Sequence, residues 1–383
     1  MARFDQALDS MRSSRVELIP WQNLAACFDV RYGATQELRT LNGRRATRPY
    51  QITVYSRLAA VRYLPQEAFV ANTDRAWFDF FAGRSRDGRV DEVNFWLPRA
   101  TTPMREMIAG ELIFFRLKKP DYAIAGYGFF ADFQALDLDL AWQTLGEKNG
   151  DPTRERFFDR IGRYRGIDLL LPTSPRAPIG CTILRDAVFW PPERWIPWSV
   201  DRNWHPNIVQ GRTERDPSSV AVLMAAVRLD QVQPPAELLM ESFQLLDDDE
   251  RAWAIRGQSV REGQGTFRLR LLKAYGRCAI TGEHTPIVLD GAHIQQYLGP
   301  RSNHVQNGVL LTKEFHALFD AGYVTITPDL TVRVSERLRI DWQNGHRYYP
   351  YDGKALVAVP ADAMLAPSRD ALAWHGQHKF LAA

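Results

Sequence analysis

The sequence has few of the features that mark secreted or membrane proteins. Its three cysteines, Cys27, Cys181 and Cys278, are odd in number and far apart in 383 residues. This argues against a disulfide framework and favours a reducing compartment. No stretch approaches the roughly eighteen consecutive apolar residues of a membrane helix. Residues 1–5 lack the apolar core of a secretory signal. These absences predict a cytoplasmic protein with no membrane partner.

Net charge is also small, at +3, while the hydrophobic content of 45% and charged content of 24% are ordinary for a folded protein. The charge is unevenly distributed. Residues 251–347 carry thirteen Lys/Arg against eight Asp/Glu, a balance of +5, and follow an acidic stretch over residues 230–250. A basic module behind an acidic connector is compatible with phosphate binding, and ordinary surface charge explains it equally well.

The length predicts two or three domains. An aromatic-rich block over residues 75–165 mixes expected strands and helices, and residues 1–60 give no clear assignment. Strands are predicted around a Pro-Asp turn, and helices where apolar residues recur at helical spacing. The predicted strands are 110–117 and 122–130, and the predicted helices are 140–145, 154–164, 219–229 and 265–275. The fold class is therefore α+β, with the acidic, Pro-containing segment 230–256 as the expected linker.

Four of the eight histidines lie within residues 284–316, and their spacing is informative. Residues 287–294 are predicted to form a strand that carries His293 near its end. A polar loop leads from there to Asn307, and a helix follows with His316. The order strand-His, loop-Asn, helix-His is the layout of a ββα-metal finger. His284 and His304 are predicted to be exposed loop residues.

Each of these residue types suits phosphodiester hydrolysis. An imidazole with a pKa of ~6.5 can accept a proton from water at neutral pH, which makes His293 the candidate general base. A divalent ion, Mg²⁺ or Mn²⁺ with Zn²⁺ or Ni²⁺ as alternatives, would supply a Lewis acid, with Asp290 and His316 as candidate ligands. Asp320 lies four residues after His316 and would orient it or complete the metal shell. Asn307 would brace the loop or the base, or bind the metal.

These motifs resemble the HNH endonuclease family over residues 257–340, which implies a metal-dependent nuclease acting on DNA. The matching motifs are Leu289-Asp290-Gly291-Ala292-His293-Ile294, Asn307-Gly308-Val309-Leu310-Leu311 and Phe315-His316-Ala317-Leu318-Phe319-Asp320. Two departures stand out. Asp290 occupies the place of a longer glutamate in this branch of the family. There are also no Cys-x-x-Cys pairs, so the structural zinc site of some members of the family is absent. Cys278 is predicted to pack in the core.

Residues 94–165 resemble the N-terminal region of predicted HNH restriction endonucleases and, more distantly, PUA-like β-barrels, a group that includes readers of modified bases. The resemblance implies a DNA-sensing domain over residues 1–229, with a PUA-like core at about 90–215. Base-stacking or phosphate contacts are expected from Trp96, Phe115, Tyr127, Trp142, Lys118 and Lys119. The alternative is that these aromatics form the core and these lysines a solvated hairpin.

The sequence thus predicts a DNA endonuclease of a restriction or other defence system, including restriction of modified DNA. Its nuclease domain would span residues 257–345, with a tail over 346–383 packed against it. A homodimer is expected on symmetry grounds, because one finger cuts one strand at a time. Two alternatives remain open: a nucleic-acid-binding module with a catalytically silent finger, and a nuclease acting on RNA or on any DNA.

Overall fold

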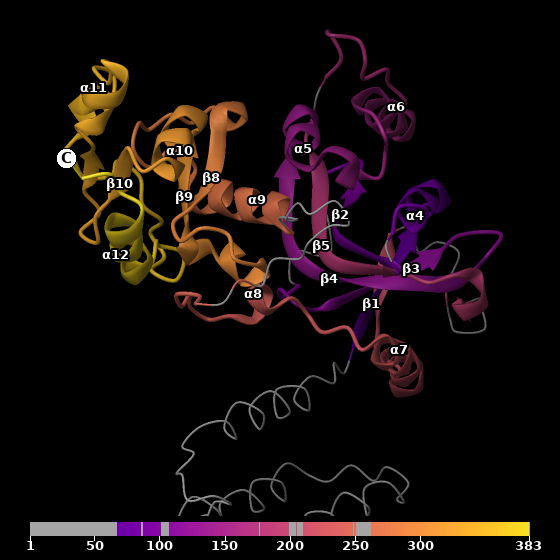
Figure 1. The fold of residues 1–383 in the computed structure, drawn as a ribbon. Coiled ribbons are helices and arrows are strands. Elements are labelled where there is room, and N and C mark those ends of the chain that lie inside the picture. Colours follow the sequence, from indigo (N-terminus) through magenta and orange to yellow (C-terminus); the bar gives the residue numbers. More distant parts are fainter. Residues whose placement is uncertain are drawn as a thin grey trace, which may run out of the picture. The chain divides into compact units, whose positions relative to one another are not determined.

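A computed structural model describes residues 67–85, 87–100, 107–175, 177–198, 204, 210–247, 249 and 262–382. Figure 1 shows their arrangement. Cys27, the unassigned segment 1–60 and residues 250–256 of the predicted linker lie outside the described residues. In the part that the structure describes, no helix is long and apolar enough to cross a membrane.

The first domain is built on a seven-stranded mixed sheet with the order β2-β5-β4-β3-β1-β7, in which β6 also pairs with β4. β1 and β3 run parallel, and every other described pair is antiparallel. The strands are β1 (Ala68–Thr73), β2 (Arg89–Leu97), β3 (Leu112–Leu117), β4 (Ala123–Leu136), β5 (Ile179–Phe189), β6 (Ile196–Pro197) and β7 (Gly211–Glu214). The predicted hairpin strands within 110–130 are confirmed as β3 and β4.

The strand order is open, which corrects the expectation of a β-barrel. Closure would require the two outermost strands, β2 and β7, to pair with each other. Among the described strands, β2 pairs with β5 and the four-residue β7 pairs with β1. The mixed α+β class is confirmed, but no closed barrel is found in the described residues.

Both faces of this sheet are buried, and each has its own apolar cluster. On one face, Trp77 and Phe81 of α4 pack on Phe115 and Phe189 of the strands. The other face is covered by helices that confirm the predictions within 140–229. The helices on this other face are α5 (Leu138–Leu145), α6 (Arg154–Arg165) and α7 (Pro217–Asp230), whereas α4 (Arg75–Ala82) lies on the first face.

The second domain is centred on a β-hairpin, β8 paired with β9, in which Asp290 lies opposite Leu311 and His293 opposite Gly308. Glycine is required at two places in it. A Cβ at Gly291 would lie 2.9 Å from Leu271, and one at Gly308 would lie 2.7 Å from Phe267. The elements are α8 (Ala236–Leu239), α9 (Gln264–Tyr275), β8 (Leu289–His293), β9 (Gly308–Thr312), α10 (Lys313–Asp320), β10 (Val324–Ile326), β11 (Val332–Val334), α11 (Arg337–Trp342) and α12 (Arg369–His378).

Helix α9 belongs to both hydrophobic cores. Leu269 packs in the cluster of the first domain, while Phe267 and Leu271 pack in the cluster of the second. At its first turn, the backbone and hydroxyl of Thr266 both donate to the carboxylate of Glu92 on β2. Figure 1 shows α9 between the large sheet and the hairpin. The two domains are therefore joined by a packed helix and not only by a connecting segment.

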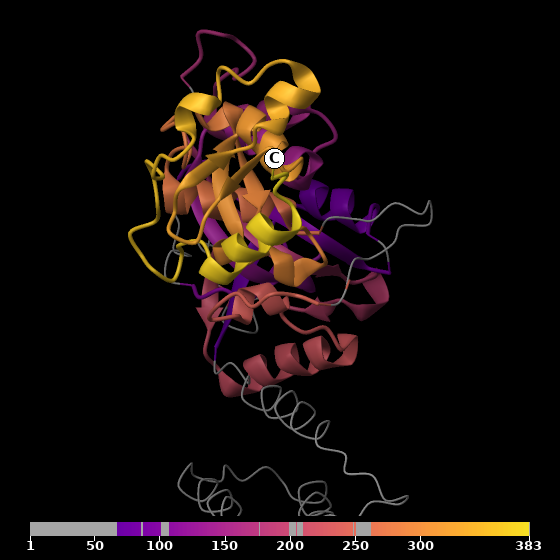
Figure 2. The same cartoon turned by 60° about the vertical axis from the view of Figure 1, so that its left-hand side comes forward.

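Segments on both sides of the hairpin complete the second core. Phe243 and Leu246, within the predicted linker, are buried in it, and their backbone N–H groups donate to Gln306 and Gln295. The C-terminal helix α12 also packs there through Ala371 and Leu372. Figure 2 shows α12 in yellow, in front of other elements of the second domain.

Candidate metal and nuclease site

The site begins with a carboxylate and an imidazole brought together by the hairpin and the following helix. Asp290 lies on β8 and His316 lies one turn into α10. His316 Nδ1 is 3.1 Å from Asp290 Oδ2. Both side chains are partly exposed, 16% for His316 and 30% for Asp290, so solvent reaches the pair. On its other side, Asp290 Oδ1 is 3.7 Å from Nε of Arg268 on α9.

Asp320 approaches the same imidazole from the opposite edge. Its Oδ2 is 3.3 Å from His316 Nε2, the nitrogen that faces away from Asp290. One ion therefore cannot bind both carboxylates and a single ring nitrogen. Metal-binding histidines usually donate their second N–H to a carboxylate, which fixes the ring orientation. Asp320 occupies that orienting position.

The Asp290–His316 pair fits two adjacent ligands of one divalent ion. Two neighbouring ligands of an octahedral ion with bonds of about 2.1 Å are about 3.0 Å apart, close to the separation of these two atoms. Mg²⁺ commonly takes only one or two protein ligands and fills its shell with water and phosphate oxygens. Within the described ranges, no group of three or more His, Cys, Asp or Glu side chains is arranged to hold a metal.

The two carboxylates control the charge of His316. Burial opposes protonation of the ring, but the hydrogen bonds with Asp290 and Asp320 prevail and raise the pKa of His316 to about 9. For Asp290, burial favours the neutral acid, yet the contact with His316 outweighs it and lowers the pKa of the carboxyl. Without a metal, the pair is therefore an imidazolium–carboxylate ion pair at neutral pH.

His293 faces the other side of the hairpin. It lies three residues after Asp290 on one strand, and side chains three apart point to opposite faces. Its ring stacks on Phe267 of α9 with centroids 4.1 Å apart, and its Nε2 is 3.1 Å from Oδ1 of Asn303. If Nε2 carries the proton that this amide oxygen accepts, the basic lone pair lies on Nδ1. Only 9% of His293 is exposed.

Asn307 is fully buried and holds the loop that joins the two strands. Its Oδ1 accepts from the N–H of Gln295 at 2.8 Å, and its Nδ2 donates to the carbonyls of Gln295 and Ser302, each at 3.0 Å. Both N–H groups of this amide and one of the two lone pairs on its oxygen are therefore used within the loop. Of the three roles open to it from sequence, the geometry matches the bracing of the loop.

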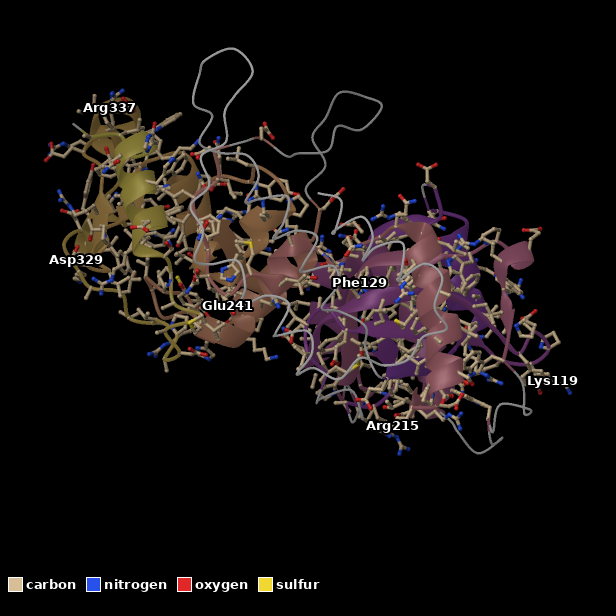
Figure 3. The ribbon with its side chains drawn as sticks, turned by 90° about the horizontal axis from the view of Figure 1, so that it is seen from below. Lys119, Phe129, Arg215, Glu241, Asp329 and Arg337 are labelled. Atoms are coloured by element: carbon tan, nitrogen blue, oxygen red, sulfur yellow. The ribbon has the colours of Figure 1, made fainter. Side chains whose placement is uncertain are left out.

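The candidate nucleic-acid residues of the first domain lie in its hydrophobic cores, against Phe157, or at a hairpin turn. Phe115 and Tyr127 have no exposed surface and pack in the sheet cores. Trp96 and Trp142 are half-buried against Phe157. The exposed residues Lys118 and Lys119 lie at the turn between β3 and β4. Figure 3 shows Lys119 at the opposite end of the molecule from the labelled Asp329 and Arg337 of the second domain.

Three residues around the site were not assigned a role from the sequence: Phe267, Arg268 and Asn303. Phe267 and Arg268 fall in the family-like segment before the first motif. The available signal for Asn303 was a polar residue in the loop after His293.

His284 is exposed as predicted. The same prediction for His304 was wrong, because His304 is buried beside Phe243 with Nε2 3.3 Å from the carbonyl of Met240. Cys278 is buried in the core, as predicted.

Comparison with known proteins found two similar solved structures and one matching family model. Two solved structures, of ASCH from Zymomonas mobilis and of a tyrosine-to-phenylalanine mutant of it, are similar at 11% and 10% identity. They cover 42% and 41% of this chain and 96% of their own, with TM-scores of 0.28 and 0.27. No curated protein matches the chain. Residues 278–327 match the family model described as HNH endonuclease. The segment that carries Asp290, Asn307 and His316 is thus a domain of the HNH endonuclease family.

Proposed function

We propose that this protein is a metal-dependent DNA endonuclease that hydrolyses phosphodiester bonds at the Asp290–His316 pair. One observation carries the proposal: a carboxylate and an imidazole lie 3.1 Å apart on the hairpin and helix of an HNH domain, with a second carboxylate on the far ring nitrogen. A divalent ion bound there would supply Lewis acidity for the phosphate and the leaving oxygen.

Three side chains of the protein orient the residues of that site and set its charge. Asp320 holds the His316 ring so that Nδ1 points toward Asp290. Asn307 fixes the loop after β8. Arg268 places a positive charge beside Asp290 and limits the repulsion that an anionic substrate would meet there. These contacts orient the site before the substrate binds.

His293 is the proposed general base, acting through Nδ1 with Asn303 fixing the tautomer. Because His293 lies on the opposite face of β8 from Asp290, its role can be tested separately from metal binding. His293→Gly would remove the ring and leave a cavity on Phe267. If His293 accepts the proton, added imidazole restores cleavage by this variant. If imidazole restores nothing while the variant remains folded, the ring serves the structure alone.

The broader role we propose is restriction, with the first domain sensing the DNA, including modified DNA. The family-like block at residues 94–165 and the packed junction through α9 support it, because a sensor must be mechanically connected to the nuclease. Parallel cleavage of unmodified, 5-methylcytosine and 5-hydroxymethylcytosine DNA tests this role. Equal cleavage of all three would remove its basis.

A second candidate is a nucleic-acid-binding module with a silent finger. It is favoured by the lack of a third metal ligand within the described ranges. Nicking of supercoiled plasmid with Mg²⁺ or Mn²⁺ separates the two candidates. The parent should nick the plasmid, and Asp290→Ala and His316→Ala should each lose at least ~100-fold in rate, the scale of one essential electrostatic group. Lys354→Gln, an exposed change, is the control. DNA binding without cleavage by the parent would favour the silent module.

A further inference from the structure

A cavity of about 320 Å³ opens beside Asp290 and is lined by both domains. The second domain contributes Arg268 and Lys313, and the first contributes Gln143 of α5 together with Lys148 of the 3₁₀ helix Gly146–Asn149 that follows. Three of these side chains are cationic, and Asp290 is the one carboxylate in the lining. The balance of charge therefore suits an anionic ligand.

The three cationic side chains differ in how far nearby carboxylates already balance their charge. Arg268 is only 12% exposed, and it donates to the carbonyls of Leu289 and Pro286 and to Thr144. These acceptors fix the guanidinium without cancelling its charge, and Asp290, at 3.7 Å, is the nearest carboxylate. Burial lowers the pKa of Arg268, but an arginine stays charged at neutral pH.

Lys148 is held by Glu92 on its buried side, with Nζ 2.7 Å from Oε2, so much of its charge is balanced. The ammonium group of Lys148 is therefore held at the wall of the cavity as a hydrogen-bond donor. Lys313 is different, since it is exposed and its side chain forms no ion pair or hydrogen bond with any residue that the structure describes. Lys313 and His316 are three residues apart on α10, which places them on one side of that helix.

We infer that this cavity binds a phosphate of the nucleic-acid backbone next to the bond that is cut, and that the first domain supplies one wall of it. The inference rests on the proposed function for the nature of the ligand. Its basis is the position of Asp290, which contributes to both the cavity and the pair with His316. The first domain thus binds substrate at the nuclease site itself, through a surface distinct from Lys118 and Lys119.

Two positions allow a test that leaves the fold intact, because Gln143 and Lys313 are both exposed. Lys313→Gln removes a charge from the second-domain wall. Gln143→Lys and Gln143→Glu form a matched pair on the first-domain wall. Lys354→Gln is the control. Binding of the full-length protein to a labelled duplex is measured in EDTA, so that no cleavage occurs, over a range of salt concentrations.

Lys313→Gln should weaken binding several-fold and reduce the slope of log K against log salt by about 0.9, the value for one lost phosphate contact. Gln143→Lys should tighten binding and Gln143→Glu should weaken it. Inorganic phosphate at millimolar concentration should not displace the duplex, because one phosphate lacks the neighbouring contacts of a strand. Displacement by phosphate alone would overturn the backbone assignment in favour of a free-phosphate site.

Plasmid nicking by the same proteins separates this inference from the proposed function. If the parent cuts DNA but Lys313→Gln and both Gln143 variants bind like the parent, the inference is overturned and the nuclease assignment stands. If the parent cuts nothing with any divalent ion but the Gln143 pair shifts binding in opposite directions, the phosphate site stands and the proposed hydrolysis fails.

Discussion

At the scale of single residues, the histidines of the nuclease domain differ most in what their two ring nitrogens contact. His316 lies between two carboxylates, and its pKa is raised to about 9. The two ring nitrogens of His375 on α12 form hydrogen bonds with neutral groups: Thr325 Oγ1 at 2.8 Å and the carbonyl of Phe319 at 3.1 Å. Burial lowers the pKa of His375 to about 4, and the ring stacks on Phe319 with centroids 3.8 Å apart. Without a metal, the same side chain is a cation at one site and a neutral core residue at the other.

His375 should make the fold sensitive to acid. Its pKa is about 6.5 in the unfolded chain and about 4 in the fold, so between these values the unfolded state binds more protons. The stabilisation is complete above pH ~6.5 and is lost as the pH falls to about 4, by about 3 kcal/mol in total. Urea unfolding between pH 4 and pH 7.5 measures it. His375→Gln should flatten this part of the pH dependence, whereas the exposed His378→Gln should leave it unchanged. A parent and a His375→Gln protein with equal pH slopes would contradict the assignment.

Asn307 gives a second prediction at this scale. Asn307→Asp keeps the acceptor for the N–H of Gln295 but places a carboxylate against the carbonyls of Gln295 and Ser302. The loss of two buried donors should lower the free energy of unfolding by on the order of 3 kcal/mol at pH 7.5. Because a protonated carboxyl can donate again, part of the loss should be recovered as the pH falls. Asn344→Asp, an exposed change, should show neither effect. A variant as stable as the parent at pH 7.5 would show that the loop does not depend on this amide.

Sequence spacing was sufficient to select Asp290, Asn307 and His316 as candidates, because each belongs to a short segment with a local signature, and the structure places Asp290 beside His316. It could not show which side of the strand His293 faces relative to α9, since that depends on packing from Phe267. The burial of His304 was missed for a similar reason: the residues that cover it, Met240 and Phe243, lie about sixty positions earlier in the chain.

At the scale of elements, α9 is capped from another domain. Its own N-cap residue is Gly263, which has no side chain to offer, and Glu92 accepts the Thr266 N–H instead. Gly265 is needed for this approach, because a Cβ there would lie 2.6 Å from Glu92 Oε2. Glu92 is fully buried. Burial opposes its ionisation, but the charges of Lys148 and Arg185 prevail and lower its pKa. The helix that positions Phe267 and Arg268 thus depends on a carboxylate of β2.

Substitution of Glu92 should affect both stability and cleavage. Glu92→Ala removes the cap and leaves Lys148 without its main partner, so the free energy of unfolding should fall by about 3–5 kcal/mol. Cleavage should also fall below the level explained by the unfolded fraction, because α9 carries Arg268 and the stacking partner of His293. Urea unfolding and plasmid nicking measure the two effects.

The matched control is Glu147→Ala, which breaks an exposed contact with Arg84 at 3.4 Å and should cost less than ~1 kcal/mol. A Glu92→Ala protein whose folded fraction cuts DNA at the parent rate would show that α9 keeps its position without the cap. The sequence predicted the helix at 265–275 from its periodicity. It gave no sign of the cap, because Glu92 and Thr266 are distant in the chain and only the fold brings them together.

At the scale of the whole molecule, the two domains share α9 and should therefore unfold together. Leu269 is fully buried in the core of the first domain, while its neighbours on α9 lie in the core of the second. Leu269→Ala should cost about 2–5 kcal/mol. Native-state hydrogen exchange should show the loss of protection in β4 and in β9 alike. Leu229→Ala, which is 79% exposed, is the control. Loss of protection confined to β4 would mean that the domains open independently.

The domain organisation was the least predictable property from sequence. Residues 230–256 were predicted to be a linker, yet Phe243 and Leu246 within them are core residues of the second domain. The open order of the sheet also could not be foreseen, because alternating apolar strands look the same in a barrel and in an open sheet. Local signals identify elements and motifs, whereas the pairing of edges depends on the complete set of strands.

The shared helix has a consequence for how the two domains of this chain can be recombined. A chimaera that joins residues 262–382 to a different first domain would lose the acceptor for Thr266 and the apolar surface around Leu269. The transplanted domain would then begin with an uncapped helix and an exposed leucine. A successful exchange of the first domain must therefore carry α9 together with β2 and Glu92, or rebuild both contacts on the new partner.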